Sequence, residues 1–563
     1  MLARCGLTRW DAGVAGFALL LLVAFAPDLM FGSWTPRMAL VSAAMPLGVV
    51  LLAVLCRRRD PAAIVLAAAS AWTLLCSGVS PFGRLAVTGT VGRDLSALTV
   101  IGSACFWAIG RMASAQGVRM LERVVLWGVA AGALVGIAQV VLSVDSGPLA
   151  LASGRPIGFM TNPVYFGAVC AAGLAVGVAL WNETSWRWVA APMFVCGMAA
   201  SLSGSRVALG AAVVVVLALA ALRRTRAAGV GAFVGVTSLA AGVLLDRTAG
   251  AGRNAADRLA SGSGGGRTTV WRYGLEAFAD RPLVGYGFGE FRPAVQGRFS
   301  AEFVRDFAAE EITQPWFDPH NAVITVLVAV GVVGLALFAG WLLVWARGVR
   351  GPLVWAVVPI ALSWMLQPMS LHTLPLAMLL FGAAGAGTVS TAAGISRRTA
   401  VALAALGVVL GAYLLAADVL MRRATNDLDG DRAAVAASMF GRDPISGDLV
   451  AQTYGRGGAT ADQLEWRERV AAWEPDRPHW WSLLAQTQIG LGLLDEAEVS
   501  VARALELQRY NVRSLNTEAI LAIYRDDEPR LDAALDELCL VSPAECVLDA
   551  RQLLEDFEPP PAP

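Results

Sequence analysis

Long apolar runs alternate with short polar connections over the first four hundred residues of the chain. Runs of roughly 20 apolar residues are typical of helices that cross a membrane. About thirteen such runs occur, centred near residues 20, 47, 70, 101, 133, 172, 195, 214, 237, 332, 361, 380 and 409. The pattern predicts an all-α fold, a polytopic membrane helical bundle of about 12–13 spans.

Three polar stretches interrupt this pattern. Residues 247–318 separate the ninth and tenth runs, residues 153–167 read "SGRPIGFMTNPVYFG", and a polar tail begins near residue 424. Gly, Pro and Asn in 153–167 favour irregular backbone, which cannot face lipid. We therefore predict a membrane core over 1–423 that includes the 247–318 loop, and a helical domain over 424–563 whose "EPPPAP" end is disordered.

Composition agrees with a membrane protein, since 56% of residues are hydrophobic and 16% are charged. The formal net charge is zero, so charge gives no reason to expect a nucleic-acid partner. All 44 basic residues are arginine, a bias that weakens arginine enrichment as a functional signal.

Arginine clusters in short loops predict the orientation of the bundle, because such loops face the cytoplasm. With a cytoplasmic N-terminus, every cluster before the thirteenth span falls on that side. The 153–167 and 247–318 stretches and the tail are then outside. Arg422 and Arg423 conflict with an outer tail. The clusters are Arg57 to Arg59, Arg111 with Arg119 and Arg123, Arg223 with Arg224 and Arg226, Arg347 with Arg350, and Arg397 with Arg398.

The tail contains one segment with the pattern of a tetratricopeptide helix pair, at 478–511. One repeat cannot bury its own apolar face, so weaker periodicity at 432–474 and 514–555 is expected to supply neighbours. An unrelated helical bundle is the alternative. The positions that match are Trp481, Leu484, Ala485, Leu491, Gly492, Ala497, Ala504 and Leu505.

The eight cysteines form no framework and show no metal-ligand spacing. Cys539 and Cys546 are seven apart in the tail and could form a disulfide if the tail lies outside the cytoplasm.

Two arginines in the outer segments suit an anionic ligand. Arg267 stands where a Gly/Ser segment meets a predicted amphipathic helix at about 268–280, and Arg206 opens the eighth span. The planar guanidinium binds phosphate oxygens bidentately, and a helix start adds unpaired backbone donors. The alternatives are an ion pair between Arg267 and Asp280 or Glu290, and contact of Arg206 with lipid phosphate.

His320 precedes an apolar run, in "WFDPHNAVITVLVAVGVVGLALF". Asp318 can cap a helix and Pro319 suits its first position, which would place His320 in the first turn at the outer surface. There it could transfer a proton near neutral pH, or serve only as an interfacial histidine bonded to backbone.

Taken together, these three residues suit one reaction. The arginines would hold a diphosphate leaving group, and the histidine would take a proton from an attacking sugar hydroxyl. This chemistry needs no metal and no cofactor. A second hypothesis, from another class, is a transporter of a small anion such as bicarbonate, with the arginines lining its entry.

"SGSRVALG", "GRTTVWRYGLEAFADRPLVGYGFGEF" and "DPHNAVITVLVAVGVVGLALF" resemble the three hallmark segments of the O-antigen ligase and polymerase superfamily. "GRPIGFMTNPVYFGA" resembles a fourth, weaker segment, and the resemblance covers roughly residues 60–390. It implies a glycosyltransferase that moves a glycan from an undecaprenyl-diphosphate carrier to an acceptor on the outer face of the bacterial cytoplasmic membrane, without metal. Relatives once proposed as bicarbonate transporters share these segments.

The resemblance also assigns roles to residues. His320 matches the family's histidine-asparagine position, where it would be catalytic. Arg206 and Arg267 match its serine-arginine and glycine-arginine positions, where they would bind diphosphate, and Arg272 is a less certain fit. The thirteenth span and the helical tail depart from typical lipopolysaccharide ligases. Because of this departure, the acceptor could be a lipid, a polymer or a protein. An envelope protein is a candidate partner of the tail.

Overall fold

The computed structural model describes residues 8–26, 29–92, 95–144, 146–147, 149–152, 154–181, 186–223, 226–248, 266–308, 318–349, 351–386 and 395–542. Within these ranges the regular structure is helical, apart from one isolated bridge between Ala152 and Arg155. The predicted all-α fold is therefore confirmed.

Each of the apolar runs predicted from the sequence has its centre inside a helix. Six helices in the described residues are long and apolar enough to cross a membrane, and six shorter apolar helices accompany them. These twelve helices, together with α1 (Arg9–Val23), form the bundle. They are α2 (Trp34–Arg57), α3 (Pro61–Gly78), α5 (Ala97–Arg111), α6 (Ala115–Val141), α7 (Pro163–Leu180), α8 (Trp186–Leu202), α9 (Arg206–Arg223), α10 (Arg226–Thr248), α15 (Ala322–Gly348), α16 (Leu353–Ser363), α17 (Leu374–Ala384) and α18 (Arg397–Asn426).

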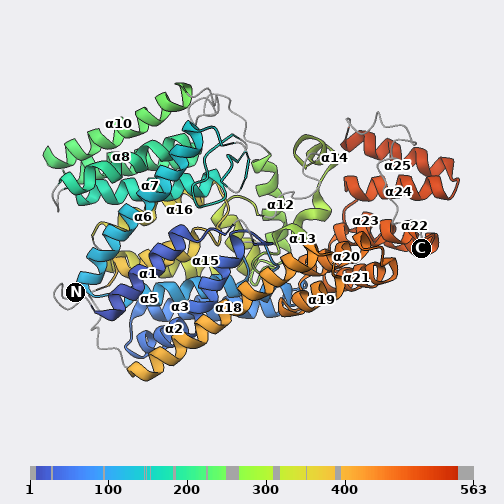
Figure 1. The fold of residues 1–563 in the computed structure, drawn as a ribbon, viewed down its shortest axis with the longest axis horizontal. Coiled ribbons are helices and arrows are strands. Elements are labelled where there is room, and N and C mark those ends of the chain that lie inside the picture. Colours follow the sequence, from blue (N-terminus) through green and yellow to red (C-terminus); the bar gives the residue numbers. More distant parts are fainter. Residues whose placement is uncertain are drawn as a thin grey trace.

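The bundle has two distinguishable ends, and the described contacts orient the helices between them. α2 and α18 run antiparallel, because Gly411 lies against Ala39 and Gly407 against Ala43. α3 and α15 are also antiparallel, since Val65 lies near Gly340, whereas Trp72, later in α3, donates through Nε1 to the carbonyl of Val330, earlier in α15, at 2.9 Å. One end therefore carries the starts of α2 and α15 and the ends of α3 and α18, and the C-terminal helices follow from it (Figure 1). We call this the tail end.

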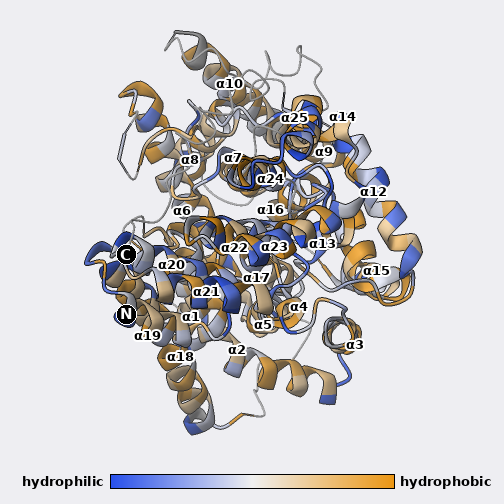
Figure 2. Ribbon diagram, turned by 90° about the vertical axis from the view of Figure 1, so that its right-hand side faces the viewer, coloured by the Kyte–Doolittle hydropathy of each residue, from blue (hydrophilic) through white to orange (hydrophobic). Residues whose placement is uncertain are grey.

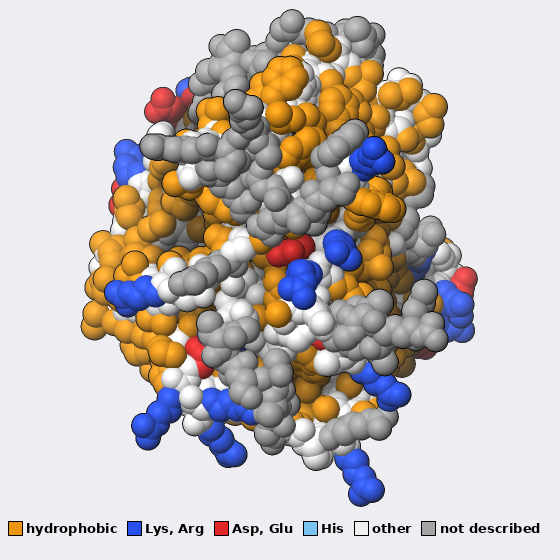
Figure 3. All heavy atoms as spheres, turned by 90° about the vertical axis from the view of Figure 1, so that its left-hand side faces the viewer, with side chains coloured by type: hydrophobic (Ala, Val, Ile, Leu, Met, Phe, Trp, Pro, Cys, Tyr) orange, Lys and Arg blue, Asp and Glu red, His pale blue; other side chains and the backbone are white. Residues whose placement is uncertain are grey.

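The opposite end carries exposed arginines. They flank the end of α2, the starts of α6 and α18, and the end of α15, and Figure 3 shows arginine side chains around this face. This is the distribution that the positive-inside rule gives a cytoplasmic face. The exposed residues are Arg57, Arg59, Arg119, Arg123, Arg347 and Arg398.

α15 is broken at Gly331, whose φ of 67° and ψ of −172° are not helical. The glycine-rich segment 282–287 lies against the break and bonds to the backbone that it frees. Val332 N–H donates to the Pro282 carbonyl, and Tyr286 N–H donates to the Val328 carbonyl, both at 2.8 Å. Non-helical backbone inside a membrane bundle requires such partners, because lipid offers none.

The described part of the long polar stretch between α10 and α15 contains several helices joined by loops. α12 (Arg267–Asp280) confirms the predicted amphipathic helix, and α13 (Phe291–Val295), α14 (Ala301–Phe303) and a turn of π-helix (Val304–Ala308) follow it. Residues 249–265 and 309–317, including the predicted Gly/Ser segment, lie outside the described residues.

The tail is a row of short helices in which each packs against the next, and α22 also packs against α24. Hydrophilic stretches gather in these helices and in α12, whereas apolar residues dominate α2 and α18 (Figure 2). The predicted repeat at 478–511 corresponds to α22 and α23, joined at Gly492 with φ of +74°. The tail helices are α19 (Gly430–Met439), α20 (Pro444–Arg456), α21 (Thr460–Trp473), α22 (Pro478–Gly490), α23 (Leu494–Leu507), α24 (Val512–Tyr524) and α25 (Glu528–Val541).

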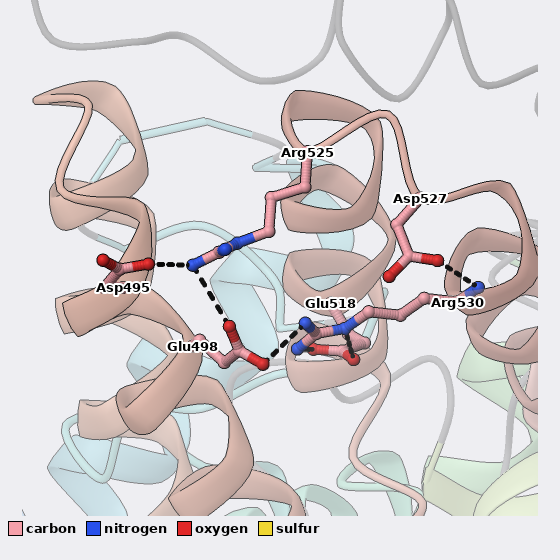
Figure 4. Close-up of polar contacts among 6 residues, drawn as sticks. All are labelled: Asp495, Glu498, Glu518, Arg525, Asp527 and Arg530. Atoms are coloured by element: carbon pink, nitrogen blue, oxygen red, sulfur yellow. Dashed lines mark hydrogen bonds and ion pairs between the residues drawn. The ribbon is translucent and has the colours of Figure 1, made fainter.

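An ion-pair network joins the last three tail helices (Figure 4). Arg525, after α24, pairs with Asp495 at 2.5 Å and with Glu498 at 3.1 Å, both on α23. Arg530 of α25 pairs with Glu498 at 2.9 Å and with Glu518 of α24 at 2.5 Å. Several charges in one network hold helices together better than isolated surface pairs do.

One of the two tail cysteines can be described. Cys539, on α25, is disulfide-bonded. Cys546, its predicted partner, lies outside the described residues, so the pairing of the two stays a prediction.

Candidate functional site

His320 does not lie in the first turn of a helix, which corrects the expectation from the sequence. Asn321 is the N-cap of α15, and its side chain accepts from the amides of Val323 and Ile324. Asp318 instead closes a turn by accepting from His320 N–H at 2.7 Å. His320 adopts φ of 56°, a left-handed conformation that non-glycine residues seldom take. Asn caps a helix as well as Asp does, and here Asn321 is the cap, so α15 begins after His320 rather than before it.

The hydrogen bond at His320 Nδ1 determines the tautomer of the ring. Nδ1 lies 2.9 Å from the carbonyl oxygen of Asp318. A carbonyl can only accept, so Nδ1 carries the proton and Nε2 carries the lone pair of the neutral ring. The arrangement therefore presents Nε2 as the basic nitrogen.

Burial and the charge of Arg267 keep this imidazole neutral. Burial, the larger cause, and the nearby guanidinium lower the pKa of His320 to about 4, against the opposing effect of its bond to the Asp318 backbone. The effect of Arg267 indicates that Arg267 and His320 lie in one region, and a contact of α12 with the loop before His320 supports this placement.

Two features of α12 fix that proximity. Gly266, in the left-handed conformation, is the N-cap of α12, so Arg267 is the first residue of the helix. One turn on, Trp271 Nε1 donates to the carbonyl of Pro319 at 2.8 Å, next to His320 in the chain. Of the predicted alternative partners for Arg267, Asp280 pairs with Arg298 instead. It also lies at the far end of α12, about 20 Å along the axis.

Arg272 lies on another face of α12 from Arg267. Five residues along a helix correspond to a rotation of about 140°. Its side chain is 65% exposed, pairs with Glu276 at 3.7 Å and lies over the ring of Tyr273. Its described contacts are thus with its own helix, and a role in binding diphosphate stays a prediction.

Arg206 begins α9 at the tail end, as the sequence predicted for its position. Gly204, with φ of 63°, turns the chain after α8, and Ser205 Oγ accepts from Ala208 N–H at 3.2 Å. Arg155 donates to the carbonyl of Ser203, just before α9, at 2.8 Å. Thr161, in the same loop as Arg155, accepts from Ser33 Oγ at the start of α2 at 3.2 Å. Arg206 therefore belongs to the tail end of the bundle.

A second histidine, His372, lies in the same layer of loops and was not singled out from the sequence. Its Nε2 is 2.9 Å from Ser33 Oγ and 3.0 Å from Thr161 Oγ1, and its Nδ1 is 2.9 Å from Ser370 Oγ. Its ring stacks on Tyr165 at 5.3 Å between centroids. Each ring nitrogen thus has a hydroxyl partner, which is typical of a structural histidine. In the sequence, the position of His372 beside Ser370 and Thr373 does not indicate that its ring is held by hydroxyl groups.

The fold and this site define a multi-pass membrane protein with an arginine–histidine centre at one end of its bundle. Residues 188–339 match the model of the family described as O-antigen ligase. The chain therefore contains an O-antigen ligase domain, which confirms the family predicted from the sequence. The matched range includes Arg206, Arg267, Arg272 and His320.

Two further comparisons add little. No curated protein matches the chain. Among solved structures, the crystal structure of the APC/C hetero-tetramer Cut9-Hcn1 matches with 9% identity over 81% of this chain and 76% of that chain, at a TM-score of 0.23. A likeness this weak bears on neither fold nor function.

Proposed function

We propose that the chain is a glycosyltransferase that moves a glycan from an undecaprenyl-diphosphate carrier to an acceptor hydroxyl, as a ligase or a polymerase of O-antigen type. The reaction takes place at the tail end, on the outer face of the bacterial cytoplasmic membrane. It needs neither metal nor cofactor. The acceptor is a lipid, a polymer or a protein.

His320 acts as the general base. Its Nε2 takes the proton of the acceptor hydroxyl while that oxygen bonds to the anomeric carbon of the donor glycan. The bond from that carbon to the diphosphate oxygen breaks, and its electron pair leaves with undecaprenyl diphosphate. Arg267 and Arg206 stabilise the charge that develops on this leaving group.

One observation carries the proposal, which is the geometry at His320. Its Nδ1 proton is committed to the Asp318 carbonyl, which leaves Nε2 as a base beside Arg267. A merely interfacial histidine would not need a neighbouring cation that disfavours its own protonation. The match of residues 188–339 to O-antigen ligases supports the same chemistry.

The test is transfer from purified undecaprenyl-diphosphate glycan by the full chain in liposomes, with a chelator present. His320→Ala should lower the rate by about 10²–10⁴, the usual contribution of a general base. His320→Gln should do the same, because an amide forms hydrogen bonds but cannot take the proton.

His479→Gln is the matched control, since this histidine lies in the tail, where its ring meets that of Trp480 edge to face. It should retain normal transfer. Near-normal transfer by His320→Ala would leave His320 as a structural residue of the turn, and loss of transfer in the chelator alone would contradict a metal-independent reaction.

A further inference from the structure

The last helix pair of the tail shares an apolar core with the site loop. This core, which we call the shared core, includes Leu515 of α24 and Leu538 of α25 on the tail side. On the loop side it includes residues of α12 to α15 and of the π-helical turn. α25 contacts both α14 and that turn. α25 and α14 lie next to each other in Figure 1. The loop members are Val270, Tyr273, Ala277, Phe291, Ala294, Val295, Phe299, Phe303, Val304, Ile324 and Val328.

A row of aromatic rings leads from this core to the start of α12. Phe303 lies 5.5 Å from Tyr273 and 5.8 Å from Phe307, measured between ring centroids. Phe307 in turn lies against Gly266, where an added Cβ would come within 2.8 Å of the ring. Gly266 is the N-cap from which Arg267 starts α12. The side chains under α25 therefore reach the turn that orients Arg267.

The tail is also fixed to the membrane core elsewhere, so α25 cannot shift freely. The Asp443 carboxylate, at the start of α20, accepts from Val91 N–H at 2.8 Å. Gln296, after α13, donates to the backbone carbonyl of Asp476. The ion-pair network of Figure 4 then carries this attachment from α23 to α25.

We propose that the C-terminal helix pair is a positioning element for the reaction, in which Leu538 and Leu515 hold Arg267 toward the lipid diphosphate through Phe303 and Phe307. This inference rests on the proposed function for the role of Arg267. According to this inference, the end of the tail affects binding of the donor. A tail that only recruits acceptors would affect binding of the acceptor instead.

The experiment compares two leucines that are equally buried on the tail. Leu538, in the shared core, and Leu521, in a core made only of tail residues, are both 0% exposed. In the full chain, Leu538→Ala should raise the KM for the undecaprenyl-diphosphate donor by about tenfold, as expected from weakening one charge-assisted hydrogen bond. The KM for the acceptor should not change. Leu521→Ala should change neither, and Leu538→Met, which restores the volume, should recover the donor KM.

Amide hydrogen exchange gives a readout that does not depend on activity. Protection of residues 267–273 should fall in Leu538→Ala and stay normal in Leu521→Ala. If Leu538→Ala is not recovered from membranes, Leu515→Ala or the milder Leu538→Val takes its place. Unchanged protection at 267–273, or a rise in the acceptor KM alone, would overturn the positioning role. Reduced protection with an unchanged donor KM would support the positioning and contradict the diphosphate role of Arg267.

Discussion

A histidine with a pKa near 4 remains neutral at neutral pH, but it is a weak base in the free protein. The donor changes this balance. A diphosphate bound to Arg267 would offset the positive charge that lowers the pKa of His320, so the pKa rises in the donor complex. In the proposed mechanism, binding of the leaving group would thus raise the basicity of His320, the base that the same reaction uses.

This leads to a prediction about pH dependence. In the proposed mechanism the neutral imidazole is the active form, so activity should fall on the acid side as His320 gains a proton. The value of kcat/KM for the donor reports the free enzyme, so its acid-side fall should lie near pH 4. The value of kcat reports the donor complex, so its fall should lie at higher pH. A histidine with the ordinary pKa of about 6.5 would instead give a fall in kcat/KM near pH 6.5. Rates measured from pH 4 to 8 decide this.

Two variants of Arg267 serve as controls for that prediction. Arg267→Gln removes the positive charge that lowers the pKa of His320. The acid-side fall of its residual kcat/KM, which we call the acid limb, should therefore move toward higher pH. Arg267→Lys keeps the charge but not the bidentate fork, so it should weaken donor binding while leaving the limb near its original position. Identical limbs in Gln, Lys and unchanged protein would contradict electrostatic coupling between Arg267 and His320.

The sequence predicted where Arg267 and His320 lie relative to the helices, but it did not predict their conformations. Arg267 at a helix start and His320 at the mouth of a span follow from local pattern and from the family resemblance. The turn at His320 depended on a competition between two good caps, Asp318 and Asn321, which side-chain preference alone does not decide. The burial that lowers the pKa depends on elements distant in the chain.

At the scale of elements, the break in α15 is what brings the site loop into the bundle. Gly331 adopts a φ/ψ combination that is essentially restricted to glycine, and a Cβ there would collide with the backbone of Leu283. From the sequence, α15 looked like one continuous apolar run. Glycine is common in membrane helices, so nothing marked this one as the site of a break.

Gly331→Ala should therefore destabilise the protein by about 1–3 kcal/mol from backbone strain, plus the cost of the collision. Gly340→Ala is the matched control on the same helix, where an added Cβ meets only Val65 at 4.0 Å. It should be neutral or stabilising by up to about 1 kcal/mol. Thermal unfolding in detergent compares the two, and equal stability would show that α15 tolerates a continuous helix.

At the scale of the whole molecule, the candidate site and the tail occupy the same end of the bundle. Exposed arginines gather at the other end. The order of the helices in the bundle was predictable because each apolar run is local. The docking of the tail was not, since the apolar residues that join it to the loop are separated by some two hundred positions.

We predict that the tail lies outside the cytoplasm. A C-terminal alkaline phosphatase fusion should be active, and a C-terminal green fluorescent protein fusion should be dark, because α18 ends at the tail end. Fusions after Arg59 provide the control and should give the reverse result, as this loop lies at the arginine-rich end. A fluorescent C-terminal fusion would place tail and site in the cytoplasm, or remove one span.

The pairing of α2 with α18 has a consequence for how the protein is made. α2 is synthesised more than three hundred residues before α18, whose Gly407 and Gly411 fit against Ala43 and Ala39. Until α18 has been synthesised, this alanine surface of α2 lacks the helix that covers it in the folded protein. The arrival of α18 closes the bundle, and Asp418 then bonds to the amides of Met30 and Phe31. Because Leu515 and Leu538 follow α18 in the chain, the site loop can gain its contacts with the tail only after α18 has been synthesised.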